Sequence, residues 1–160
     1  MTEHRFVRIA LALTLSVALA GCSPSPSSSS GMDGAAQRDA ARPAIAAVGD
    51  AEASASVVPT SMLSDAVAAR YGVTREPGLV LVLVGLRVGD EAQRATVSGQ
   101  ARDLRGVAQS LEFREVQADG LIDYVSTARI RPPDTLRFDI GVVTGDQERA
   151  QLKFSRDILP

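Results

Sequence analysis

Between residues 50 and 158 the sequence is a series of short segments in which apolar and polar residues alternate, separated by Gly, Pro or Asp. The segment 135–144 reads TLRFDIGVVT, and every second residue from Leu136 to Val142 is apolar. Apolar residues at every second position predict β-strands, and turn residues at intervals of roughly 10–15 residues predict hairpin connections. We therefore predict an all-β fold, an antiparallel β-sandwich of about seven strands, rather than a helical bundle or a βαβ fold.

Two stretches inside this region depart from simple alternation. Residues 79–84 read LVLVLV and are apolar at every position, which is typical of a strand buried on both faces. Residues 64–71 read SDAVAARY, with Ser64 at the N-cap position and Gly72 directly after them. Because an N-cap hydroxyl and a glycine beyond the last turn mark the ends of many helices, we predict one short helix at about 64–71.

Residues 1–21 have the features of a signal peptide. Two arginines precede an apolar run at 9–20, which is too short to cross a bilayer as a helix. The letters LAGC at 19–22 resemble a lipobox, so we expect acyl chains on Cys22 that anchor the protein in a membrane. Cys22 is followed by Ser23 and not by the Asp typical of inner-membrane retention, so we expect the outer membrane, facing the periplasm.

After the signal peptide, residues 22–49 are predicted to form a flexible tether rich in Ser, Pro and Ala, and residues 50–160 the sandwich domain. The chain has one Cys and one His, namely Cys22 and His4. Acylation of the first and removal of the second with the signal peptide would leave no thiol or imidazole for catalytic triads, dyads or His-ligated metals. We therefore predict a protein that is not an enzyme and has no cofactor and no metal site.

The charge pattern excludes a further class of partner. The net charge is −2, and acidic and basic residues are interleaved along the chain. Proteins that bind nucleic acid concentrate Lys and Arg to neutralise phosphates, so we expect no nucleic-acid partner.

Acidic residues suggest two sites that we weigh against simpler explanations. Asp119 and Asp123 could supply oxygen ligands for calcium, but a turn residue and a strand-face residue explain them better. Glu115 with Asp123, or Asp134 with Asp139, could form the carboxylate pair of a glycoside hydrolase. The aromatic residues that usually line sugar clefts are missing near these pairs, which disfavours this activity.

A third group of polar residues is the candidate interaction patch. Arg114, Glu115, Tyr124 and Arg137 could cluster on neighbouring strands and recognise a partner. Cross-strand ion pairs on a solvated face, which contribute about 0.2–1 kcal/mol each, explain them better.

Three functions remain open at this point. The first is a non-catalytic, lipid-anchored module that binds another envelope protein or acts as an accessory subunit; a weak edge strand at Ala51 to Val58, which ends at Pro59, could accept a partner strand. The alternative is a carrier or sensor that holds a small apolar or lipidic ligand between the sheets. An enzyme that uses carboxylates alone is the least favoured.

Several short motifs occur in an order that resembles a known family. They are VSGQ at 97–100, LEFREV at 111–116, TLRFDI at 135–140, and KF at 153–154 with the closing LP at 159–160, in addition to the helix segment at 65–73. Over about residues 50–160 the chain resembles a periplasmic family of Gram-negative bacteria known as domain of unknown function 4426.

The resemblance implies a small β-sandwich of immunoglobulin-like type, with no activity to carry over. Members of the family tend to have aromatic and His residues where this chain has Ala and Ser at 51–58. Any site that the family keeps on that strand would therefore lack its side chains here.

Overall fold

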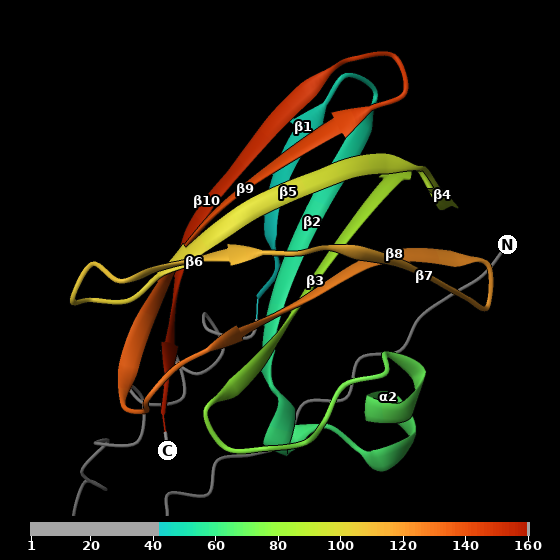
Figure 1. Cartoon of the computed structure of the whole chain (residues 1–160). Helices are drawn as coiled ribbons and strands as arrows, with labels where there is room; N and C mark the ends of the chain where they lie inside the picture. The colour runs from blue at the N-terminus through green and yellow to red at the C-terminus, as the bar shows by residue number, and fades with distance from the viewer. Residues whose placement is uncertain (1–41, 160) are drawn as a thin grey trace, which may run out of the picture.

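Two antiparallel sheets pack face to face in the part of the chain that the structure, a computed structural model, describes, residues 42–159 (Figure 1). One sheet, which we name sheet A, has the strand order β1-β2-β3-β8-β7, with β4 beside β3. The other, sheet B, has the order β10-β9-β5-β6. The prediction of an all-β antiparallel sandwich is confirmed. The predicted signal peptide and Cys22 lie outside the described residues.

The elements have the following bounds. Sheet A contains β1 (Ala44–Val48), β2 (Ala51–Pro59), β3 (Leu79–Val88), β4 (Glu91–Ala92), β7 (Arg114–Ala118) and β8 (Leu121–Arg129). Sheet B contains β5 (Ala95–Arg102), β6 (Ala108–Leu111), β9 (Asp134–Thr144) and β10 (Arg149–Ile158). Between β2 and β3 lie a 3-10 turn, η1 (Thr60–Met62), and the helix α2 (Asp65–Arg70).

The main core lies between the two sheets. The apolar residues of β9 at every second position point into it and are almost fully buried, as the alternation predicts; they are Leu136, Phe138, Ile140 and Val142. Phe138 stacks on Phe154 of β10, with ring centroids 5.0 Å apart. Because burial of each large apolar side chain contributes about 1.5–3 kcal/mol, this layer is the main source of stability.

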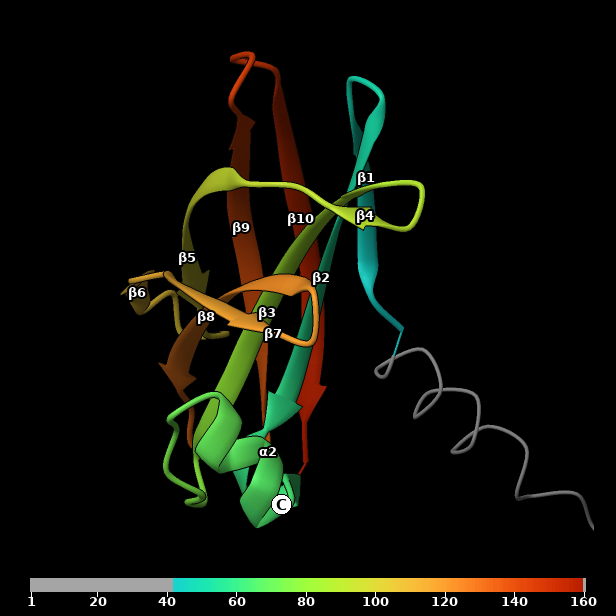
Figure 2. The same ribbon diagram turned by 90° about the vertical axis from the view of Figure 1, so that its right-hand side faces the viewer.

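A second, smaller core lies on the outer face of sheet A, where α2 and the residues before it pack against part of β3 and β8. Figure 2 shows α2 in front of the lower end of β3. Leu81 and Val125 point outward from these strands and pack against Leu63 and Ala68. The run LVLVLV is therefore buried on both faces, as predicted. The helix begins as expected, because Val67 N–H donates to the Ser64 hydroxyl at 3.3 Å. Among the described residues no helix is long and apolar enough to cross a membrane.

The N-terminal part of the sandwich differs from the prediction. The segment Ala51 to Val58 is not an edge strand, because β2 pairs with β1 on one side and with β3 on the other. Residues 44–48, which we assigned to the tether, form β1, so the sandwich begins at Ala44 and not at residue 50. The letters AIAAV contain no polar residue, so the strand shows no alternation of polar and apolar positions.

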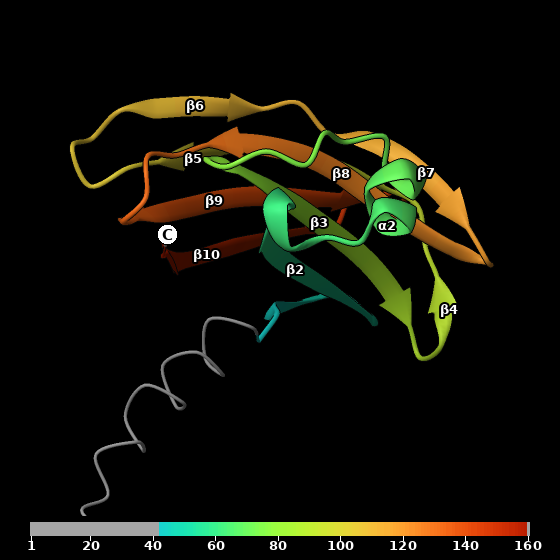
Figure 3. The same cartoon turned by 90° about the horizontal axis from the view of Figure 1, so that it is seen from below.

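One predicted strand, 107–116, is two strands in different sheets. Residues Glu112 and Phe113 separate β6, which pairs with β5, from β7, which pairs with β8. Figure 3 shows β6 and β7 following one another along the same flank of the sandwich. The chain passes here from one sheet to the other, and we name the segment 108–118 the crossover segment.

Candidate functional site

The predicted interaction patch is only partly brought together. Glu115 lies opposite Tyr124 across β7 and β8, and Arg114 is next to it on β7. Arg137 lies on β9 in the other sheet, so the prediction that all four residues cluster is wrong for this residue. Strand order depends on long-range pairing, which the local sequence pattern does not contain.

The two residues that do meet form a structural contact, which we name the Tyr124 brace. The hydroxyl of Tyr124 donates to Glu115 Oε2 at 3.1 Å and accepts from the N–H of Ala95 at 2.8 Å. Ala95 begins β5, so the hydroxyl joins sheet A to sheet B. The Gln117 amide, Tyr124 and Arg94 hold the pKa of Glu115 below its usual value, and burial raises the pKa of Tyr124. Both groups keep their ordinary charge at neutral pH and act as structural partners.

The candidate calcium residues contact different partners. Asp119 forms an ion pair with Arg70 at 3.2 Å, and Asp123 accepts a hydrogen bond from the hydroxyl of Tyr71 at 2.9 Å. Burial and the contact with Asp123 raise the pKa of Tyr71. Within residues 42–159 no three His, Cys, Asp or Glu residues are arranged to hold a metal ion.

The candidate carboxylate pairs are also separated. Glu115 points to the inner side of sheet A with Tyr124, while the neighbouring Asp123 points to the outer side with α2. Asp134 and Asp139 are five positions apart on one strand and so point to opposite faces. This arrangement does not fit a glycosidase, whose two carboxylates must face one another across the substrate.

The outer face of sheet B carries two adjoining hollows. Side chains alternate between the faces of a strand, so Asp139 and Gly141 point outward on either side of the buried Ile140. Gly141 lies opposite Ser98 of β5 and opposite Gln151 of β10. No helix or strand within the described part of the chain covers this face, whereas α2 covers part of the outer face of sheet A.

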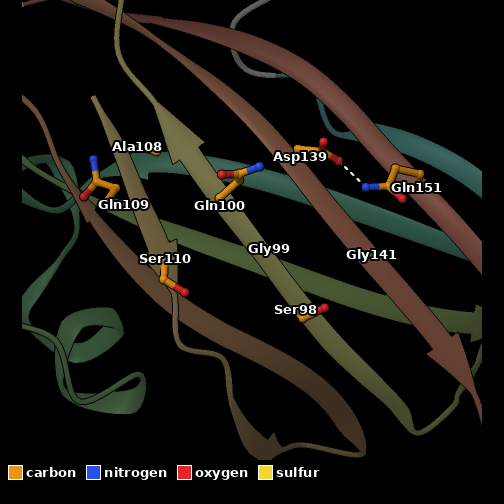
Figure 4. Close-up of a pocket in the computed structure, with 9 residues that line it drawn as sticks. All are labelled: Ser98, Gly99, Gln100, Ala108, Gln109, Ser110, Asp139, Gly141 and Gln151. Carbon is orange, nitrogen blue, oxygen red and sulfur yellow. Dashed lines mark hydrogen bonds between the residues drawn. The ribbon is translucent and has the colours of Figure 1, made fainter. Parts of the chain in front are cut away.

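A trough of about 510 Å³ runs over this face (Figure 4). Its polar lining includes Ser98, Gln100, Ser110, Asp139 and Gln151. The amide of Gln151 donates to the carboxylate of Asp139, as the dashed line in Figure 4 marks. The floor has no side chain at Gly141, and this creates the hollow.

Packing does not require a glycine at position 141. A Cβ atom there would lie 3.7 Å from Ser98 Oγ, an ordinary contact distance. At Gly99, which points inward, a Cβ would lie 2.8 Å from the carbonyl oxygen of Asp139 and 3.1 Å from Ile140 Cα, which is too close. A glycine inside a strand costs about 0.5–1 kcal/mol relative to alanine. Gly99 is explained by packing, and Gly141 is not.

A second hollow of about 530 Å³ adjoins the trough and shares Gln100 and Asp139 with it. Its charged lining also includes Arg102, Arg137 and Lys153, and we name it the basic recess. Sequence reasoning identified only Arg137 among these cations. The alternation marks all three as outward-facing, but only the register of β5, β9 and β10 places them together.

A larger cleft of about 700 Å³ opens at one end of the sandwich. Most of its charged residues have structural partners: Arg105 pairs with Asp103 at 2.8 Å, and Arg129 pairs with Glu76 at 2.9 Å. The Val107 N–H and Arg105 hold the pKa of Asp103 below its usual value. The Asp103 contacts shape the loop between β5 and β6, and the Arg129–Glu76 pair joins β8 to the segment before β3, so the cleft is a weaker candidate than the trough.

Known proteins share this fold. FetP of uropathogenic Escherichia coli, in a copper-bound variant, is 9% identical, with a TM-score of 0.50 over 73% of this chain and 91% of FetP. FetP as isolated after expression in the E. coli periplasm is also 9% identical, with a TM-score of 0.50 over 74% and 95% of the two chains. At this identity the likeness concerns the fold alone.

A nearer relative is a crystal structure of a DUF4426 family protein from Pseudomonas aeruginosa. It is 28% identical, with a TM-score of 0.65, over 74% of this chain and 95% of that chain. No curated protein matches the sequence. The model of the DUF4426 family, a domain of unknown function, matches residues 45–160. This match and the shared fold show that the chain belongs to the DUF4426 family.

Proposed function

We propose that this protein is a non-catalytic, lipid-anchored periplasmic module that binds another envelope protein through the trough on sheet B. The observation that carries the proposal is Gly141. This glycine destabilises its strand, is not needed for packing, and opens a polar hollow on the outer face of sheet B, over which α2 does not pack.

The chemistry of the described residues supports a binding role over catalysis. Residues 42–159 contain neither His nor Cys. The carboxylates with lowered pKa values, Asp103 and Glu115, are engaged in loop and strand contacts. We propose no copper site to match the copper of the FetP variant. The only methionine within residues 42–159, Met62, is 77% exposed, and this range has no His or Cys that could bind a metal with it.

The location is part of the proposal. It is supported by the signal-peptide pattern, by the lipobox-like LAGC that ends at Cys22, and by Ser23 after it. We propose attachment to the outer membrane on its periplasmic side. The alternative of an apolar ligand between the sheets has no observation in its favour, because the inner side chains Leu86, Leu136 and Ile140 are at most 1% exposed.

Site-specific photocrosslinking in intact cells tests the proposal. A photoreactive residue is placed in the trough at Gln100 or Ser110, and as a control at Glu52 or Arg87, which are exposed on the outer face of sheet A. We expect the same crosslinked partner from both trough positions and none from the controls. Gly141→Val, which fills the hollow, should abolish the crosslink without lowering stability. Recovery of only uncrosslinked protein from both trough positions would contradict the proposal.

A further inference from the structure

Two arginines face each other across the outer surface of sheet B. Arg102 on β5 lies directly opposite Arg137 on β9. Like charges in this position destabilise a pair of strands. Among the residues that the structure describes, neither arginine has a carboxylate within 4.0 Å, although Arg102 donates to the carbonyl of Gly106 at 3.0 Å. No carboxylate within residues 42–159 therefore offsets the repulsion between the two cations.

The basic recess adds a third cation to this pair. Lys153 lies one row further along the sheet, 3.9 Å from Asp139, at the wide end of the ion-pair range. Three cationic side chains thus line the recess against a single carboxylate. On a chain with a net charge of −2, this is a local excess of positive charge that favours an anionic partner.

The geometry favours carboxylates over a single phosphate. Phosphate sites are usually built from free backbone N–H groups at a helix N-terminus or a glycine-rich loop, and here the amides of β5 and β9 belong to strands paired with each other. Arg102 and Arg137 lie directly opposite one another, so one carboxylate can reach both, and Lys153 is the diagonal neighbour of Arg137, about 7–8 Å away. Alternate side chains of an extended peptide are separated by a similar distance, about 6.6 Å. A guanidinium group binds a carboxylate through two parallel hydrogen bonds.

We infer that the basic recess binds an acidic, extended segment of the partner protein, with carboxylates at alternate positions that contact Arg102, Arg137 and Lys153. This inference rests on the proposed function, because it names the chemistry of the partner segment that the trough and the adjoining basic recess would bind. Gln100 and Asp139 line both hollows, so one extended segment can occupy the two together.

The first test uses defined probes and the purified full-length protein. A hexapeptide of alternating Asp and Ser is titrated while the Nε–Hε signals of the arginines are followed by NMR. We expect shifts at Arg102 and Arg137, and about tenfold weaker binding in the double variant Arg102→Gln/Arg137→Gln, a loss of about 1.4 kcal/mol. Arg87→Gln, which removes one arginine charge from the outer face of sheet A, is the control and should leave the Kd unchanged, whereas Arg102→Gln and Arg137→Gln should each weaken binding when made singly.

Other results would overturn the inference. One is tighter binding of inorganic phosphate, or of phosphatidylglycerol vesicles, than of the acidic peptide. Others are an equal loss in the Arg87→Gln control, equal binding of a peptide with Asn in place of Asp, or no shift at either arginine. Tighter binding of phosphate or of vesicles would assign the basic recess to a free phosphate or to a membrane. Each of the other results would show that the recess is not a specific site for carboxylates.

The crosslinking experiment separates this inference from the proposed function. If the crosslink from Gln100 persists undiminished in the Arg102→Gln/Arg137→Gln background, the protein has a partner but the basic recess does not recognise it, and the inference fails alone. If the protein with Arg102 and Arg137 intact gives no crosslink from either Gln100 or Ser110, the proposed function fails, and the inference that rests on it fails too.

Discussion

Replacing Tyr124 by Phe tests whether the Tyr124 brace holds the two sheets together. The change removes one oxygen and keeps the ring in the core. It leaves the Ala95 N–H, which lies 2.8 Å from that oxygen, without its partner. A fully buried donor that loses its partner costs about 1–3 kcal/mol. Ala95 is only half-buried, which places its loss in the lower part of this range, and Glu115 loses a hydrogen bond as well. We therefore expect the free energy of unfolding to fall by about 2 kcal/mol.

Urea unfolding followed by circular dichroism measures this change. The slope m should stay constant, because the surface exposed on unfolding does not change, and the midpoint should fall by about 1 M. Tyr71→Phe is the matched control: it also removes a hydroxyl bonded to a carboxylate, that of Asp123, but no backbone group depends on it. We expect a smaller loss there, below about 1 kcal/mol. Equal losses in the two variants would refute the reasoning that the unpaired Ala95 N–H accounts for most of the destabilisation in Tyr124→Phe.

Three further predictions concern stability. Gly99→Ala should lower the free energy of unfolding by about 1–3 kcal/mol, because its Cβ meets Asp139, whereas Gly141→Ala should leave it unchanged or raise it; chemical denaturation that ranks them in reverse would contradict this. The folded-state pKa of Glu115 is lowered, so its stabilising effect is present above the ordinary carboxyl pKa and is lost as the pH falls below about 4. The free energy of unfolding, measured between pH 7 and 3, should therefore depend less on pH in Glu115→Gln than in the unsubstituted protein. Identical pH profiles for the two proteins would count against this effect. Gln109→Ala should cost about 1–2 kcal/mol and speed hydrogen exchange of the Arg129 amide, since the Gln109 side chain bonds both the N–H and the carbonyl of that residue; an unchanged rate would argue against this role.

Local patterns predicted the parts of the fold that depend on local chemistry. Alternation located β9 and its buried face, and the N-cap and glycine located α2. The run at 79–84 predicted a strand covered on both sides, which α2 and sheet B provide. The strand at 44–48 was missed, since a segment made only of Ala, Ile and Val has no polar residues to mark its outer face.

The candidate site was harder to predict because it depends on strand order. Arg137 was identified, but it was grouped with Glu115 of the other sheet. The switch at Glu112 and Phe113 was missed because its trace in the sequence is small: the apolar positions shift by one residue between Phe113 and Val116, and such a shift does not say that the chain enters the other sheet. Gly141 resembles any strand glycine until the structure shows that a Cβ would fit there. Non-local pairing, and not residue chemistry, is the missing information.

The crossover segment has a consequence for how the molecule opens. Its first half completes one sheet and its second half completes the other, so neither layer can peel away while the other keeps all its strands. Slow-exchanging amides of β5 and β8 should then become labelled by deuterium at the same rate under native conditions, as one cooperative unit. One continuous segment is thus part of both sheets, and it couples the opening of one sheet to the opening of the other.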